Sequence, residues 1–360
     1  MGGKCYSVIA GTGSYLPTRR VPNDHFLHNE FYNSAGERLK NPNEETIKKF
    51  REITGISERR YVTDDLVASD IAALAARNAL ESSGIDPESL DYIIVGHNFG
   101  DVKANNPRSD FVPSLAARVK HKLGVVNPKT VAYDLPFGCP GWLQGMIQVD
   151  SYIKSGDCRR AMVIGAETLS RISDPHDRDS MIYADGAGAT ILESRESDRP
   201  IGILAHAARS DTLAHAYMLW MGRSFDPNHK GDELYLKMDG HRLYEYALKT
   251  VPLVVKESMD KAGVALGAVK KILIHQANEK MDEAILRRLF KLCGAGAMPR
   301  NIMPMTISWL GNSSVATLPT LLDLIAKGEM EDHEWEPGAI IAFASVGAGM
   351  NINSVVYRIA

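Results

Sequence analysis

Short apolar runs alternate with longer amphipathic segments along the whole chain. Runs rich in β-branched residues, such as "YIIVGHN" at 92–98 and "RAMVIGAE" at 160–167, predict buried strands. Between such runs lie segments like "ASDIAALAARNALESSG" at 68–84, which has apolar residues at helical spacing and ends on a glycine. This alternation indicates an α/β protein in which helices cover both faces of sheets of parallel strands.

One helix–glycine–strand unit occurs twice. Its copies are "GIDPESLDYIIVGHN" at 84–98 and "GVALGAVKKILIHQAN" at 263–278, each preceded by an amphipathic helix. The polar stretch "ESRESDRP" at 193–200 has the composition of a linker. We therefore predict two related halves, residues 1–195 and 196–360. Two polar segments, 32–50 and 221–240, are predicted to be long surface loops, the first partly helical at its end. Loops of this size in an α/β enzyme often shape an entrance.

Composition narrows the class of protein. The chain has 360 residues with 41 basic and 44 acidic side chains, so nothing suggests binding to nucleic acid. No apolar run is long enough for a membrane span or a signal peptide, and we expect a cytoplasmic protein without membrane insertion. Four scattered cysteines with no CxxC pair predict neither a disulfide framework nor a metal site. Single-cysteine chemistry remains open.

Cys139 stands in "DLPFGCPGW", 134–142, between a predicted strand and a predicted helix. The unpaired amides and dipole of a helix N-terminus favour an anion, so we expect the pKa of this thiol to be lowered. The alternative is a buried small hydrophobic residue. Cys5, Cys158 and Cys293 are expected to be structural.

Three later motifs supply partners for a thiolate. His275 and Asn278 follow the apolar strand in "ILIHQANEK", although a histidine hydrogen-bonded at a domain surface is the plainer interpretation. Asn312 in "GNSS" is either a catalytic amide or a helix N-cap. Gly347 and Gly349 in "ASVGAGMN" are either plain turn residues or positions that aim an amide at an oxyanion.

The order of these motifs resembles the β-ketoacyl-acyl-carrier-protein synthase III family of the thiolase superfamily. The resemblance covers nearly the whole chain, including "IAGTGSYLP" at 9–17, "ITGISERRY" at 53–61, "FVPSLAARV" at 111–119 and "DPHDRDSMIYADGAGATILE" at 174–193. It implies a thiolase-like five-layered αβαβα sandwich built from two duplicated halves, and a homodimer.

The resemblance also implies roles for single residues. Cys139, His275 and Asn312 match a Cys-His-Asn triad, and the amides of Cys139 and Gly349 match an oxyanion hole. The family transfers an acyl group from acyl-CoA or an acyl-carrier protein to the cysteine. A decarboxylative Claisen condensation with malonyl-acyl-carrier protein then gives a 3-oxoacyl thioester, and no cofactor is expected beyond these thioesters.

Further assignments concern the acyl pocket and the carrier protein. Phe111 and Val112 match a segment that closes the partner's acyl pocket across the dimer, and Trp142 is expected at the pocket floor. The basic residues expected to dock an acidic acyl-carrier protein share one helix face, for which a merely solvated face is the alternative. They are Lys280, Arg287 and Arg288.

Two positions depart from the family pattern. Lys49 and Ile53 replace a tryptophan and an arginine that grip the adenine of coenzyme A, so we expect weak coenzyme A binding and a different acyl donor. Two other functions therefore stay open. One is a specialised condensation of two acyl or β-ketoacyl thioesters in lipid or polyketide biosynthesis. The other is a non-catalytic partner subunit, although such subunits typically lack the nucleophile.

Overall fold

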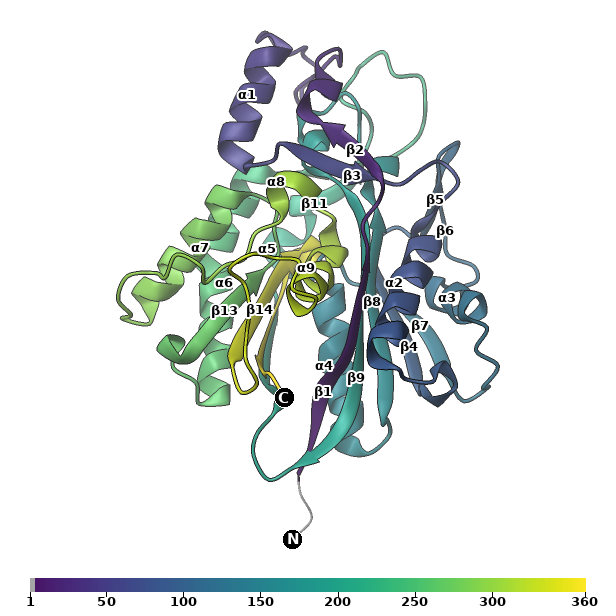
Figure 1. Cartoon of the computed structure of the whole chain (residues 1–360). Helices are drawn as coiled ribbons and strands as arrows, with labels where there is room; N and C mark the ends of the chain where they lie inside the picture. Colours follow the sequence, from purple (N-terminus) through teal and green to yellow (C-terminus); the bar gives the residue numbers. More distant parts are fainter. Residues whose placement is uncertain (1–3) are drawn as a thin grey trace.

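The computed structural model describes residues 4–360, which form two mixed β-sheets stacked with helices between and outside them (Figure 1). The N-terminal sheet has the strand order β1-β9-β8-β4-β7. Its strands are β1 (Lys4–Tyr15), β4 (Tyr92–His97), β7 (Val131–Pro136), β8 (Arg160–Thr168) and β9 (Asp185–Ser197). The C-terminal sheet has the order β10-β15-β14-β13. Its strands are β10 (Gly202–Ser210), β13 (Val269–Ile274), β14 (Ile340–Gly347) and β15 (Asn351–Arg358).

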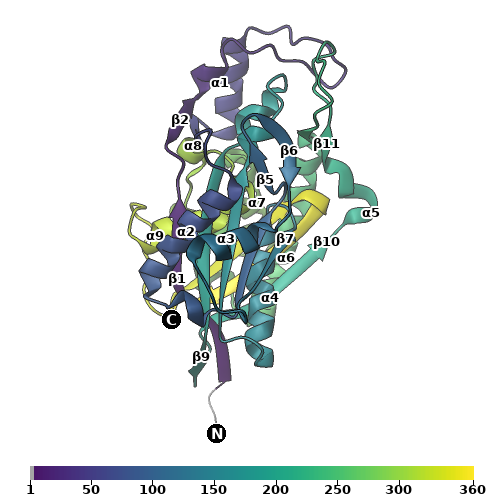
Figure 2. The same cartoon turned by 90° about the vertical axis from the view of Figure 1, so that its right-hand side faces the viewer.

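Three apolar clusters separate five layers. The helices are α2 (Ala68–Ser83) and α3 (Leu115–Leu123) on the outer face of the first sheet, α4 (Gly141–Ser155) and α9 (Thr317–Ala326) between the sheets, and α6 (Gly240–Ala262) and α7 (Glu279–Leu292) on the outer face of the second. Figure 2 shows α2 and α3 in front of their sheet. The expected αβαβα sandwich is therefore confirmed.

The predicted repeat is also visible. In both copies a helix ends at a glycine in the left-handed region, Gly84 at φ 65° and Gly263 at φ 64°. A short 3-10 turn then leads into β4 or β13. The change of sheet falls between Ser197 and Gly202, a few residues beyond the expected boundary at 195.

Strand direction differs from the prediction of parallel sheets. β4 runs parallel to β7 and β8, and β13 runs parallel to β14, but β9 and β15 are antiparallel to both of their neighbours. β15 follows β14 after one 3-10 turn, Ala348–Met350, which is too short for the crossover that a parallel neighbour needs. The longer link from β8 to β9 contains 3-10 turns and no α-helix. The sheets are therefore mixed.

Smaller elements form a cap over one end of the sandwich (Figure 1). They are the strand pairs β2 (Arg19–Pro22) with β3 (Glu58–Tyr61) and β11 (Leu219–Gly222) with β12 (Tyr235–Met238), with helices α1 (Asn43–Thr54), α5 (Thr212–His215) and α8 (Ile307–Leu310). A third pair, β5 (Asp101–Lys103) with β6 (Asn106–Asp110), projects beside α3 (Figure 2). Within residues 4–360 no helix is long and apolar enough to cross a membrane.

Candidate active site

A deep cavity of about 1610 Å³ opens beneath the cap. Its walls come from the 32–41 loop, one face of α1, the β11–β12 pair and the start of α6. Both segments that the sequence indicated as loops therefore line an entrance. Cys139, His275 and Asn312 all line this one cavity, although they lie far apart in the sequence.

Cys139 lies in the turn between β7 and α4, two residues before the helix begins. Burial raises the pKa of its thiol to about 11, and a hydrogen bond from Ser314 opposes this rise. The expected lowering of the pKa by the helix N-terminus is therefore wrong. Removal from water disfavours the thiolate more than the helix end favours it.

His275 directly follows β13, and its backbone amide donates to the carbonyl of Ala344 on β14 at 2.8 Å. The side chain is only 4% exposed, and burial lowers its pKa to about 4. The ring is therefore neutral near pH 7 and can donate one hydrogen bond without carrying charge. Asn278, the other candidate in this motif, caps α7 by accepting from the amide of Met281 at 3.0 Å.

Asn312 is clamped by the segment that leads into β9. Its backbone amide donates to Ile182 and its carbonyl accepts from Ala184, at 3.0 and 2.8 Å. The side-chain Oδ1 accepts from the backbone amide of Ser314 at 2.8 Å. Because a backbone amide only donates, this contact identifies the facing atom as oxygen and leaves the Asn312 Nδ2 group without a protein acceptor among residues 4–360.

Ser314 joins the candidate triad, and the sequence analysis did not single it out. Its hydroxyl donates to Cys139 Sγ at 3.2 Å, while its backbone contacts the side chains of Asn312 and His275. Its φ of 54° lies in the left-handed region, which is rare for serine and often marks a functional position. The only sequence signal was its place two residues after Asn312.

Gly347 lies against Cys139 at the end of β14. A Cβ at this position would be 2.6 Å from the backbone nitrogen of Cys139 and 3.0 Å from its Cβ. Gly349, the predicted oxyanion residue, follows two positions later with φ 75° and is not among the described residues that line the cavity. Its role stays a prediction.

The three residues predicted for the acyl pocket do not line the cavity of this chain. Trp142 is buried between the sheets and packs edge-on against Phe343, so its assignment to the acyl pocket is not supported. The second residue of α4 faces the inter-sheet layer rather than the cavity. Phe111 and Val112 are 46% and 85% exposed and do not line the cavity of their own chain.

The remaining candidates lie on the surface or at the mouth. Lys280, Arg287 and Arg288 are all exposed on α7. Lys49 and Ile53 line the cavity on α1, and Lys49 pairs with Glu45 of the same helix at 2.6 Å. Within residues 4–360 no group of His, Cys, Asp or Glu side chains is placed to hold a metal ion.

Comparison with known proteins decides the family. The sequence model of 3-oxoacyl-[acyl-carrier-protein] synthase III matches residues 133–212, and the model of its C-terminal part matches residues 259–359. The chain belongs to this family. It is therefore a condensing enzyme, an acyltransferase of the β-ketoacyl synthase type.

Solved structures agree with this assignment. The 3-oxoacyl-[acyl-carrier-protein] synthase III of Aquifex aeolicus VF5 is 28% identical with a TM-score of 0.77, covering 98% of this chain and 99% of that one. The enzyme of Pseudomonas aeruginosa PAO1 is 25% identical at TM-score 0.79, over 98% of each chain. The priming β-ketosynthase of the R1128 polyketide pathway is also 25% identical, with a TM-score of 0.80, covering 100% of this chain and 98% of that one.

Gly347→Ala tests the contact beside the nucleophile. Gly347 has an extended backbone that any residue can adopt, so the substitution changes only the space beside Cys139. We expect acylation of Cys139 to fall by at least about a hundredfold, because a small displacement of a reacting atom has that effect. Gly267→Ala, whose new methyl group meets nothing within 4 Å, is the matched control. Unaltered acylation of the Gly347 variant, measured by mass spectrometry, would contradict the contact.

Proposed function

We propose that the chain forms an acyl-Cys139 thioester and then performs a decarboxylative condensation with malonyl-acyl-carrier protein. The observation that carries this proposal is the meeting of Cys139, His275 and Asn312 on one cavity around Ser314. In the first step Cys139 Sγ attacks the carbonyl carbon of an acyl thioester. The donor leaves as a free thiol and the acyl group stays on the enzyme as an equally activated thioester.

The second step uses the two neutral donors. His275 and the free Nδ2 of Asn312 donate to the thioester oxygen of the malonyl group, which stabilises the enolate formed when carbon dioxide leaves. The enolate carbon attacks the acyl carbonyl, and Cys139 departs with the electron pair of the broken C–S bond. The product is a 3-oxoacyl thioester on the carrier protein. The amides of Cys139 and Gly349 would bind the carbonyl oxygen in both steps.

Cavity size supports a bulky apolar acyl group. Ligand pockets for one small molecule are usually about 300–1000 Å³, and this cavity is larger. Aromatic and aliphatic side chains dominate its inner wall, among them Phe50, Phe99, Leu236, Met238 and Leu243. A long acyl chain fits such a surface better than a two-carbon group does.

We propose that a carrier protein rather than coenzyme A delivers the acyl group. Lys49 is paired with Glu45, and Ile53 is 53% exposed, so neither offers the stacking surface that an adenine needs. The exposed basic residues of α7 lie on a helix that begins four residues after His275. A carrier protein held there would bring its thioester to the cavity mouth.

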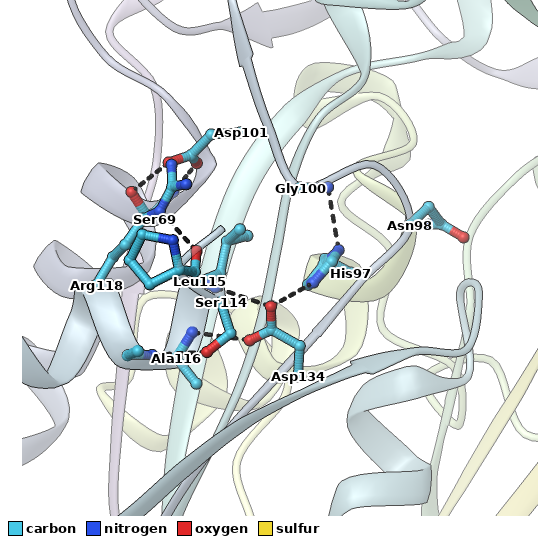
Figure 3. Close-up of polar contacts among 12 residues, drawn as sticks. Ser69, His97, Asn98, Gly100, Asp101, Ser114, Leu115, Ala116, Arg118 and Asp134 are labelled. Atoms are coloured by element: carbon cyan, nitrogen blue, oxygen red, sulfur yellow. Dashed lines mark hydrogen bonds and ion pairs between the residues drawn. The ribbon is translucent and has the colours of Figure 1, made fainter. Parts of the chain in front are cut away.

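We further propose a homodimer in which Phe111 and Val112 contact the second copy. Arg118 holds their segment by pairing with Asp101 at 2.6 Å (Figure 3). It also pairs with Asp110 at 2.7 Å and donates to the carbonyl of Pro113. Two exposed apolar side chains on a rigidly held segment are typical of a binding surface.

Cys139→Ala tests the nucleophile. After incubation with acyl-carrier proteins of increasing chain length, mass spectrometry should show one added acyl group on the unaltered chain and none on the variant. Occupancy should increase from acetyl to long-chain donors because the cavity wall is apolar. Equal acylation of the variant would refute the assignment of Cys139.

Arg288→Glu tests the delivery route. Its charge reversal should raise the KM for malonyl-acyl-carrier protein about fivefold with little change in kcat, as expected for one exposed charge contact. Lys270→Glu is the control, because Lys270 is exposed at the end of β13 away from His275. Calorimetry should detect only weak binding of coenzyme A. A tight complex, or equal effects of the two reversals, would refute carrier-protein delivery through α7.

Val112→Asp tests the dimer. Burying the new carboxylate at the interface should weaken self-association by roughly thirtyfold, a typical effect at a central contact. Sedimentation equilibrium of the unaltered chain should show a dimer that Val112→Asp dissociates. Leu292→Asp, at another exposed apolar position at the end of α7, should remain dimeric. A monomeric unaltered chain would rule the dimer out.

A further inference from the structure

The Cys139 sulfur has one side-chain hydrogen-bond partner within residues 4–360, the hydroxyl of Ser314 at 3.2 Å. A serine hydroxyl carries a single proton and can accept as well as donate. The effect of Ser314 on the sulfur therefore depends on where that proton points. A second group that donates to Ser314 Oγ leaves its proton free to point at the sulfur.

Asn98 supplies that second group. Its Nδ2 lies 3.2 Å from Ser314 Oγ and 2.5 Å from Glu167 Oε1, and the same carboxylate oxygen accepts from the Asn98 backbone amide. An ionised carboxylate only accepts hydrogen bonds, so Asn98 must turn its NH₂ group toward Glu167. One amide proton then goes to Glu167 and the other to Ser314.

Glu167 is well placed to fix this orientation. It is the second-last residue of β8 and is 1% exposed, and its side-chain partners among the described residues come only from Asn98. Burial raises the pKa of Glu167 to about 7, and contacts with His97 and Asn98 oppose the rise. The carboxylate form of Glu167 is therefore favoured as the pH rises above about 7.

The loop that carries Asn98 is held independently of the cysteine. His97 Nε2 contacts Asp134 Oδ2 at 3.0 Å, and His97 Nδ1 accepts from the backbone amide of Gly100 at 3.1 Å. Asp134 also accepts two backbone amides at the start of α3. Figure 3 shows the Asn98 side chain pointing away from this cluster. These contacts hold the loop in place, and the Asn98 side chain extends from it toward Ser314.

We propose that Ser314 is a fourth catalytic residue that donates a hydrogen bond to the Cys139 thiolate, and that Asn98 and Glu167 are positioning residues that fix the direction of this bond. The inference rests on Cys139 being the nucleophile. Glu167 orients Asn98, Asn98 donates to Ser314, and Ser314 donates to the sulfur. The bond stabilises the thiolate before attack and again when it leaves the acyl group.

The test is the pH profile of Cys139 alkylation by iodoacetamide, with the modified peptide quantified by mass spectrometry. Alkylation needs no acyl substrate. The role of Ser314 can therefore be refuted while condensation is still observed, and condensation can be absent while the role of Ser314 is supported. Ser314→Ala should slow alkylation at pH 8 about tenfold and move the profile upward by about one pH unit. Asn98→Leu should move it in the same direction by a smaller amount. The double variant should match Ser314→Ala, because the residues act in series.

Ser313→Ala is the matched control, since its hydroxyl faces Thr317 at 3.4 Å rather than the sulfur. Its profile should coincide with that of the unaltered chain. An unchanged profile for Ser314→Ala or for Asn98→Leu overturns the proposal. The proposal is also overturned if the profile of the double variant shifts by the sum of the two single shifts. A profile shift in Ser313→Ala equal to that in Ser314→Ala would overturn it as well.

A second pair of variants tests Asn98 even if the single variant Asn98→Leu does not fold. Asn98→Leu removes a donor from a buried carboxylate, which can unfold the chain. Glu167→Gln keeps an accepting oxygen without charge, so Glu167→Gln and the combined Glu167→Gln/Asn98→Leu can be compared directly. The pH midpoint of Cys139 alkylation should be higher for the combined variant than for Glu167→Gln alone. If both variants are folded and their alkylation profiles have the same pH midpoint, the proposed role of Asn98 is overturned.

Discussion

The packing of α4 and α9 between the two sheets fixes where the reacting groups lie. Cys139 stands two residues before α4, and Ser314 begins the 3-10 turn that leads into α9. Val315 in that turn is buried against Gly165 of β8, where any side chain would overlap its carbonyl oxygen. Because one apolar layer holds both helices, the nucleophile and the Asn312 turn cannot move independently.

The chemistry follows from this placement. Burial beneath the cap lowers the pKa of His275, which keeps the ring neutral, and raises the pKa of Cys139, which disfavours the free thiolate. Neutral donors suit a reaction in which negative charge appears only in the transition state. A hydrogen bond to the sulfur is stronger in surroundings less polar than water, so the Ser314 contact gains importance there.

Much of this site could be predicted from the sequence, since each triad member sits beside a local signal. Cys139 lies in a glycine-rich turn, His275 at a strand end and Asn312 after a glycine. The rest depended on distances that sequence does not encode. Asn98 and Ser314 are 216 residues apart, and the hint in the sequence was a charged residue, Glu167, near the end of an apolar strand. Strand directions and the orientation of Trp142 required the three-dimensional packing.

The repeated unit gives the two halves histidines at matching places. His97 ends β4 and His275 follows β13, each after the same helix, glycine and 3-10 turn. In the first copy both ring nitrogens are engaged, by Asp134 and by Gly100. In the second, the ring of His275 lines the cavity together with Cys139 and Asn312. The same position in the repeated unit therefore holds a structural brace in one half and a cavity-lining residue in the other.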